Sequence, residues 1–349
     1  MGLKELLGAT IEKKASDLHV TVGVPPMLRI NGAICPYGDL KMLPQDVLRL
    51  LEEILEDRQL KILDESGDMD TSYSVDGLGR FRFNIYKQRG TYAFVARAIP
   101  FSVPDLTQLG LPPVIGELAN ISKGMILVTG PTGSGKSTTL AAMLDKINNE
   151  RNEHIITLED PIEFLHRHRR SIINQREIGC DTKSFAAALR SSLRQDPDII
   201  LVGEMRDLDT IATALTAAET GHLVLSTLHT IGAAKTIDRI IDVFPPHQQS
   251  QIRVQLSTVL QAVVSQQLIP RADGKGRVAA VEVMVVNNAI RNLIREGKSH
   301  QIASSIQTGS KYGMQSMDSS INGLYRRGLI TEADALTCAL DPELVLKLG

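Results

Sequence analysis

The segment MILVTGPTGSGKSTTL, residues 125–140, decides the fold of this chain. Its first residues are apolar or β-branched and predict a short buried strand. A glycine-rich turn follows and matches G-x-x-x-x-G-K-[ST] in full, with Gly130, Gly135, Lys136 and Ser137 at the defined positions. Glycines let backbone N–H groups approach phosphate oxygens, and the helix that begins near Ser137 adds the positive end of its dipole. The segment therefore predicts a nucleoside triphosphate site.

The turn also predicts what each residue does. Lys136 is expected to reach the β- and γ-phosphates, and the Ser137 hydroxyl is expected to bind Mg²⁺. The expected cofactors are therefore ATP and Mg²⁺. The residues expected to contact the nucleotide are Gly130, Pro131, Thr132, Gly133, Ser134, Gly135, Lys136, Ser137 and Thr138.

Composition narrows the class of protein. The chain has 349 residues, enough for two domains. A net charge of −2, 4% aromatic residues and no tryptophan argue against a nucleic-acid partner. Cys35, Cys180 and Cys338 form no C-x-x-C pair, so they indicate no zinc module and favour a reducing, cytoplasmic compartment. No run approaches about 18 apolar residues, so we expect no direct membrane insertion.

Two parts of the chain differ in pattern. Residues 1–99 predict a small α+β domain, with a helix over 1–15, two short strands within 17–30, a helix over 45–63 and alternating strands over 69–98. Residues 100–113 contain four prolines and predict an inter-domain linker.

Residues 114–349 alternate apolar strands with helices and predict an α/β domain with a parallel-rich sheet. The expected strands are 126–129, 154–158, 199–202 and 223–227, and the expected helices are 137–149, 184–195 and 208–220. We further expect a long helix from about 246 to 268, a strand at 277–286 and C-terminal helices over about 287–349.

Carboxylates follow two of these strands. Glu204 lies after an apolar strand, at the edge where open α/β sheets bind ligands, and is expected to hold Mg²⁺, partly through water. Glu159, Asp160 and Glu163 follow another strand. Hydrolysis needs a carboxylate that orients a water opposite the γ-phosphate, and the spacing leaves open which of these three does so.

Cationic residues offer further candidates. His229, at the carboxyl end of its strand, is expected to sense the γ-phosphate. Arg80 and Arg82 share one face of a strand, and Arg97 lies on the next. Spacing alone does not decide whether these arginines bind phosphate or form surface ion pairs.

Taken together, the motifs resemble one family, the secretion ATPases of type IV pili and type II secretion, and within it the pilus retraction ATPases (the PilT group). The matching segments are ASDLHVTVGVPPMLRING (15–32), GRFRFNIYKQRG (79–90), LEDPIEF (158–164), TGHLVLSTLHT (220–230) and AIRNLIREGKSHQI (289–302).

The resemblance implies a PAS-like N-terminal domain joined to a RecA-like ATPase domain, assembled as a homohexamer. It assigns water activation to Glu163 and the Walker B role to Glu204. It also implies that Arg82 and Arg97, with Arg80, close over the nucleotide.

The implied function is an ATP-hydrolysing motor for pilus retraction and twitching motility. It would act on an inner-membrane platform protein from the cytoplasmic face of that membrane. Scattered cysteines do not match the four-cysteine zinc module of the extension ATPases, which favours retraction. The alternatives are an accessory retraction paralogue that needs another motor, a RecA-like nucleic-acid translocase, or an ATP-binding scaffold that does not hydrolyse. A second retraction ATPase is a further expected partner.

Overall fold

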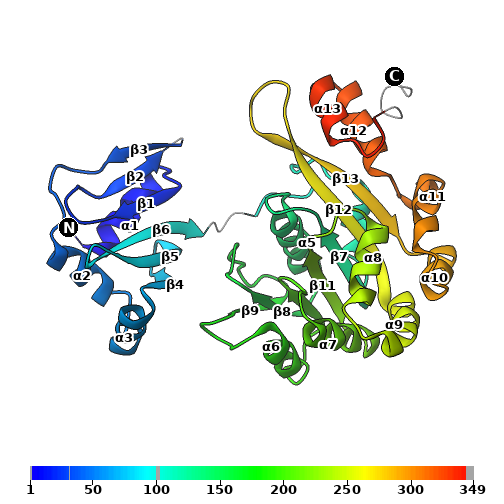
Figure 1. The fold of residues 1–349 in the computed structure, drawn as a ribbon, viewed down its shortest axis with the longest axis horizontal. Coiled ribbons are helices and arrows are strands. Elements are labelled where there is room, and N and C mark those ends of the chain that lie inside the picture. The colour runs from blue at the N-terminus through cyan, green and yellow to red at the C-terminus, as the bar shows by residue number, and fades with distance from the viewer. Residues whose placement is uncertain (1, 31, 100–102, 343–349) are drawn as a thin grey trace. The chain divides into compact units, whose positions relative to one another are not determined.

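The computed structural model describes residues 2–30, 32–99 and 103–342, which fall into two compact units (Figure 1). The first unit comprises Met1–Ser102 and Pro161–Leu165, and the second comprises Val103–Asp160 and His166–Gly349. The predicted linker 100–113 begins in residues outside the described ones, and the predicted C-terminal helices continue into 343–349, which also lie outside them.

The first unit is an antiparallel sheet with helices on one face. The strand order is β3-β2-β1-β6-β5-β4. Its strands are β1 (Asp17–Val20), β2 (Met27–Ile30), β3 (Ala33–Pro36), β4 (Asp68–Val75), β5 (Gly79–Gln88) and β6 (Thr91–Ile99), and its helices are α1 (Leu3–Glu12), α2 (Pro44–Glu52) and α3 (Asp57–Ser66). The core joins leucines of the helices to Phe81, Phe83 and Phe94 of the sheet. Because side chains alternate along a strand, Arg80 and Arg82 lie on the opposite face, as predicted.

The single helix predicted over 45–63 is wrong, because the chain breaks it into α2 and α3. The Gln59 side chain accepts a hydrogen bond from the Glu56 backbone N–H at 3.0 Å. This reciprocal cap begins a new helix at Asp57.

The second unit is built on a seven-stranded sheet of order β13-β12-β7-β11-β10-β8-β9 (Figure 1). All neighbours are parallel except β12 and β13. The strands are β7 (Gly124–Thr129), β8 (His154–Glu159), β9 (Ile172–Glu177), β10 (Ile199–Val202), β11 (Leu223–Leu228), β12 (Leu260–Pro270) and β13 (Arg277–Val285). The predicted fold class is confirmed: a small α+β domain precedes an α/β domain with a parallel-rich sheet.

Helices cover both faces of this sheet. On β7, Ile126 and Val128 pack with α4 (Pro113–Leu118) and α5 (Lys136–Glu150). Met125 and Leu127 face the other layer, which contains α6 (Phe185–Ser192), α7 (Leu208–Glu219), α8 (Ala233–Asp242), α9 (Pro246–Val259), α10 (Asn288–Arg295) and α11 (Ile302–Gln307). Burial on both sides explains why these strands are continuously apolar.

The long helix predicted to about residue 268 is wrong beyond Val259. There the chain leaves helical geometry at Leu260 and continues as β12 beside β7. A short buried strand and a buried helix have the same apolar pattern, and the β-branched Val263 and Val264 favour the strand.

The C-terminal helices pack against the β12–β13 pair, where their apolar side chains contact Ile269 of β12 and Ala280 of β13 (Figure 1). They are α12 (Met317–Arg326) and α13 (Glu332–Cys338). Thr331 caps α13, because its hydroxyl accepts a hydrogen bond from the Asp334 N–H at 3.1 Å. Two short 3₁₀ turns, η1 (Ser299–Gln301) and η2 (Ser310–Tyr312), flank α11.

Candidate functional site

The glycine-rich turn joins the carboxyl end of β7 to the first residue of α5, Lys136. Gly133 and Gly135 have φ values of 76° and 88°, which other residues rarely adopt. The Lys136 ammonium group is buried and donates hydrogen bonds to the carbonyls of Gly130 and Pro131 at 2.9 and 3.0 Å. The lysine therefore folds back over its own loop, at the N-terminus of a 15-residue helix.

The loop has the features that a phosphate group needs. Ser134 Oγ is buried and makes no hydrogen bond in the structure. A buried hydroxyl without a partner is costly, and a phosphate oxygen would satisfy it. With the Lys136 ammonium and the helix N-terminus beside it, the residues present fit an anionic ligand.

Gln266 on β12 contacts the phosphate loop, and no pattern in the sequence predicted this contact. This residue is 3% exposed. Its amide donates to the Ser134 carbonyl at 2.7 Å and accepts from Thr139 Oγ1 at 2.8 Å. A Cβ at Gly130 would lie 2.1 Å from the Gln266 carbonyl oxygen, and one at Gly135 would lie 2.7 Å from its Nε2. Close packing on Gln266 thus requires both motif glycines.

Glu204 and His229 meet at the ends of the adjacent strands β10 and β11. His229 Nε2 lies 3.5 Å from Glu204 Oε2, and Arg206 Nε lies 2.8 Å from Glu204 Oε1. The Glu204 side chain is 22% exposed, whereas those of His229 and Arg206 are 42% and 71% exposed. Two of the predicted site residues are therefore brought together, and Arg206 is an addition to them.

Hydrogen bonds between the strands fix these ends. Thr227 Oγ1 donates to the Gly203 carbonyl at 2.6 Å, and Ser226 Oγ donates to the Val202 carbonyl at 2.7 Å. The Met205 N–H donates to the Thr227 carbonyl at 3.2 Å. Glu204 is thereby held between two residues that are each bonded to β11.

The three acids at and beyond the end of β8 divide between the two units. Glu159 Oε1 accepts from Thr157 Oγ1 at 2.6 Å and from Gln175 Nε2 at 3.1 Å, so this carboxylate is fixed at the end of β8. Asp160 is exposed in the second unit. Glu163 is also exposed, and its segment Pro161–Leu165 groups with the first unit.

The turn after β11 is anchored by two residues that the sequence did not reveal. The Gly232 N–H donates to Ser265 Oγ at 2.9 Å, and the Ala233 N–H donates to Glu282 Oε1 at 2.8 Å. Burial raises the pKa of Glu282, against the effect of the hydrogen bonds that it accepts from the Ala233 and Met317 N–H groups. Glu282 thus links the turn after His229 to the start of α12.

No group of three or more His, Cys, Asp or Glu side chains suited to a metal is present among the residues that the structure describes. Mg²⁺ usually retains several waters and needs only one or two protein carboxylates beside the substrate phosphates. Glu204 and the Ser137 hydroxyl are a donor set of that kind, and they fit Mg²⁺ rather than a fully protein-coordinated metal.

The three predicted arginines all lie in the first unit and have partners there. Arg97 bonds to Asp17 Oδ1 through Nε at 2.8 Å and Nη2 at 2.7 Å. Arg82 lies 3.7 Å from Asp70, and Arg80 bonds to Ser72 and Ser74. Arg82 and Arg97 are directly opposite each other on β5 and β6.

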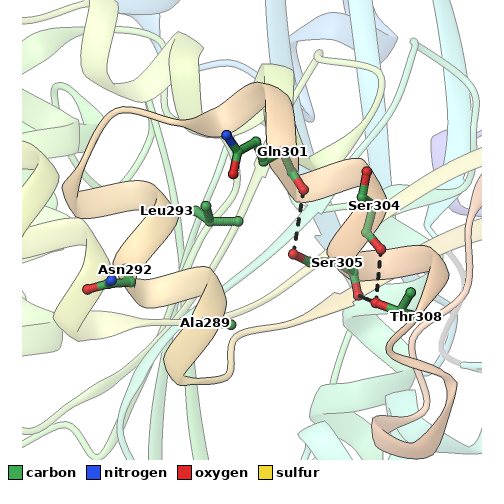
Figure 2. A pocket seen from close by; sticks show the side chains of 7 residues that line it. All are labelled: Ala289, Asn292, Leu293, Gln301, Ser304, Ser305 and Thr308. Carbon is green, nitrogen blue, oxygen red and sulfur yellow. Dashed lines mark hydrogen bonds between the residues drawn. The ribbon is translucent and has the colours of Figure 1, made fainter.

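An open pocket of about 600 Å³ lies between α10 and α11 (Figure 2). Its lining residues are Ala289, Asn292, Leu293, Gln301, Ser304, Ser305 and Thr308. The Ser305 hydroxyl donates to the Gln301 carbonyl, and the Thr308 hydroxyl donates to the carbonyls of Ser304 and Ser305, as Figure 2 shows. Hydroxyls engaged in this way do not make a catalytic site.

A family model described as Type II/IV secretion system protein matches residues 105–332. The type IV pilus retractation ATPase PilT of Pseudomonas aeruginosa is 50% identical, over 98% of this chain and 99% of that protein. The type IV pilus ATPase PilU of the same organism is 40% identical, over 100% of this chain and 92% of that protein.

A crystal structure of the pilus retraction motor PilT with bound ADP has the same fold. Its TM-score is 0.92 at 49% identity, with 99% of both chains covered. The likeness therefore includes the antiparallel first unit as well as the second unit, which carries the glycine-rich loop. In the described part of the chain, no helix combines the length and apolar character needed to cross a membrane.

Proposed function

Because this chain belongs to the type II/IV secretion ATPase family and, within it, to the pilus retraction (PilT) group, we propose that it is a hexameric motor that uses ATP to retract a type IV pilus. The family makes it an ATPase. We further propose that six copies form a ring, that the ring acts on a platform protein, and that single residues have the roles given below.

One observation carries it. The buried Lys136 begins α5, after the loop that follows β7, and β7 lies next to β11 in the sheet. His229 directly follows β11, and Glu204 follows β10, the strand on the other side of β11. A phosphate-binding loop and an acid–histidine contact thus occupy one edge of a parallel sheet, where such sheets bind ligands. The ADP in the related PilT structure supports a nucleotide at this loop.

The residues of the second unit divide the work of phosphoryl transfer. Backbone N–H groups of the loop, which Pro131 lacks, and the Lys136 ammonium hold the phosphates. His229 responds to the γ-phosphate and is oriented by Glu204. Ser137 and Glu204 hold Mg²⁺, which supplies positive charge for the transferred phosphate.

The water opposite the γ-phosphate needs a carboxylate, and we assign Glu163 on the family's pattern. Glu159 is the alternative, because its hydrogen bonds to Thr157 and Gln175 fix it at the strand ends. Arg82 and Arg97, with Arg80, are proposed to reach the nucleotide from the first unit. We divide the chain into 1–99, a linker over 100–113, and 114–349 with C-terminal helices from about 287.

We place the motor in the cytoplasm, at the inner face of the membrane, where an inner-membrane platform protein is its partner. Nucleic acid is not part of the proposal, because the net charge is −2. The 40% identity to PilU supports a second candidate, an accessory retraction ATPase that works beside another motor.

ATP turnover per subunit, measured against protein concentration with Mg²⁺ and without DNA, tests the proposal. We expect turnover to rise from near zero to a plateau as the ring assembles. A rate that does not depend on concentration would argue against the assembled motor, and turnover that requires DNA would favour a translocase. Restored retraction in cells that lack their own motors separates a principal from an accessory ATPase.

A further inference from the structure

Asp17 lies at the centre of a row of charged residues that crosses the sheet of the first unit. It pairs with Arg29 of β2, and the register of β1 with β6 sets it opposite Arg97. Arg97 in turn is opposite Arg82 of β5. Leu18 and Val20 are buried in the core, so Asp17 is on the other face of β1. One carboxylate therefore shares a row with three guanidinium groups.

This arrangement is costly unless the cations are held apart. Like charges directly opposite each other on neighbouring strands are destabilising. Arg97 turns toward Asp17, with contacts of 2.8 and 2.7 Å to Oδ1, whereas Arg29 Nε remains 3.8 Å from Oδ2. Ser16 donates to Oδ2 at 2.8 Å. Asp17 thus bonds Arg97 far more closely than Arg29.

The ion pair leaves part of Arg97 available. The Asp17 side chain is 7% exposed, but that of Arg97 is 67% exposed. The contacts use Nε and Nη2 along one edge of the guanidinium. Of its five N–H donors, those at the outer end still point away from Asp17 and match two phosphate oxygens.

We propose that Asp17 is the positioning residue for Arg97: it clamps one edge of the guanidinium so that the other edge is presented to the nucleotide phosphates. The inference rests on the proposed function, which places Arg97 at the nucleotide. A flexible arginine loses side-chain entropy when it binds phosphate, and a fixed one has lost much of it beforehand. Asp17 therefore acts on turnover through Arg97 and touches no substrate.

Burial opposes ionisation of Asp17, but hydrogen bonds from Ser16 and Arg97 outweigh it and hold the pKa of this carboxyl below its usual value. His19, on the same face, has its pKa lowered by burial. The clamp is therefore charged, beside a neutral imidazole, at neutral pH.

The test is a double-mutant cycle between Asp17→Asn and Arg97→Ala in the full chain, at the plateau concentration. Asp17→Asn should lower kcat about tenfold and change KM for ATP less than twofold, because a transition-state contact is weakened. In the Arg97→Ala background, Asp17→Asn should have no further effect. The control is Asp64→Asn, which removes another ion-paired carboxylate of the same unit, bonded to Lys87 and Tyr92, and should leave kcat unchanged.

The outcomes separate the inference from its premise. If Arg97→Ala turns over ATP normally, the role of Arg97 fails and the clamp with it. If Arg97→Ala lowers kcat and Asp17→Asn does not, the clamp alone is refuted. The clamp is also refuted if Asp17→Asn lowers kcat by the same factor in the Arg97→Ala background as in the wild type. Faster turnover in Asp17→Asn would mean that Asp17 holds Arg97 away from the nucleotide, and it would also refute the clamp. Should Asp17→Asn not fold, Asp17→Glu, which keeps the charge but displaces it, must lower kcat severalfold.

Discussion

Gln266→Leu tests whether the phosphate loop depends on a residue outside its motif. Leucine has a similar size but no polar atoms, so the Ser134 carbonyl and the Thr139 hydroxyl lose their bonds of 2.7 and 2.8 Å. The Thr139 hydroxyl can turn to a carbonyl of the preceding helical turn, which limits its loss. The Ser134 carbonyl has no such choice inside the loop.

The expected magnitude follows from that one group. A buried polar group left without its partner costs about 1–3 kcal/mol. If the loop must regain its shape to bind phosphate, this cost appears in nucleotide affinity as a loss of about 5- to 150-fold. Melting of the nucleotide-free protein should change less, because the loop can relax when it holds no ligand.

Calorimetric titration with ADP and with ATP measures the affinity, and Gln267→Leu is the matched control. Gln267 is the next residue of β12, points to the other face and donates to the Cys338 carbonyl at 3.1 Å. The same substitution there removes a hydrogen bond that is remote from the loop. Equal nucleotide affinities in the two variants would refute the role of Gln266 in the loop. If the melting temperature of nucleotide-free Gln266→Leu fell as strongly as its affinity, Gln266 would stabilise the fold in general and not the phosphate loop in particular.

Three further predictions concern other parts of the site. Lys136→Ala should abolish turnover, because it removes the charge at the transferred phosphate; a steady-state phosphate-release assay at the wild-type rate would contradict the loop assignment. Glu163→Gln should bind ATP normally and hydrolyse it at least about a hundredfold more slowly, with Glu159→Gln as the comparison; the reverse order in single-turnover rates would move the water-activating role to Glu159. Because the pKa of Asp17 is lowered on folding, its contribution to stability is present above its unfolded pKa of about 3.9 and is lost as pH falls through the lower, folded pKa; unfolding of the full chain, followed from about pH 6 to 3, should depend less on acid in Asp17→Asn, and identical profiles would oppose this.

Local patterns predicted much of this fold. Strands buried on both faces have continuous apolar sequences, and four of them were assigned correctly around the glycine-rich loop. In the first unit, alternation identified β4 to β6 and the two faces of β5. The edge strands β3 and β9 were not predicted, because most of their residues are exposed or half-buried and their sequences therefore lack a long continuous apolar run.

Contacts between residues that are far apart in the chain could not be predicted from local sequence patterns. Asp17 and Arg97 are 80 positions apart, and only the antiparallel register of β1 with β6 brings them together. Glu159 and Glu163 are four residues apart, yet they belong to different compact units, which spacing along the chain does not reveal.

The wrong prediction of a helix over 246–268 also hid the role of Gln266. As part of a helix over 246–268, Gln266 had no reason to approach the phosphate loop. As part of β12, it continues the parallel register in which Ser265 is opposite Thr129, so it arrives beside Gly130. Gly130 and Gln266 are 136 residues apart in the sequence, and they meet because the sheet order places β12 next to β7. A phosphate-binding motif therefore specifies the backbone that meets the ligand, whereas the neighbouring strand specifies what holds that backbone in place.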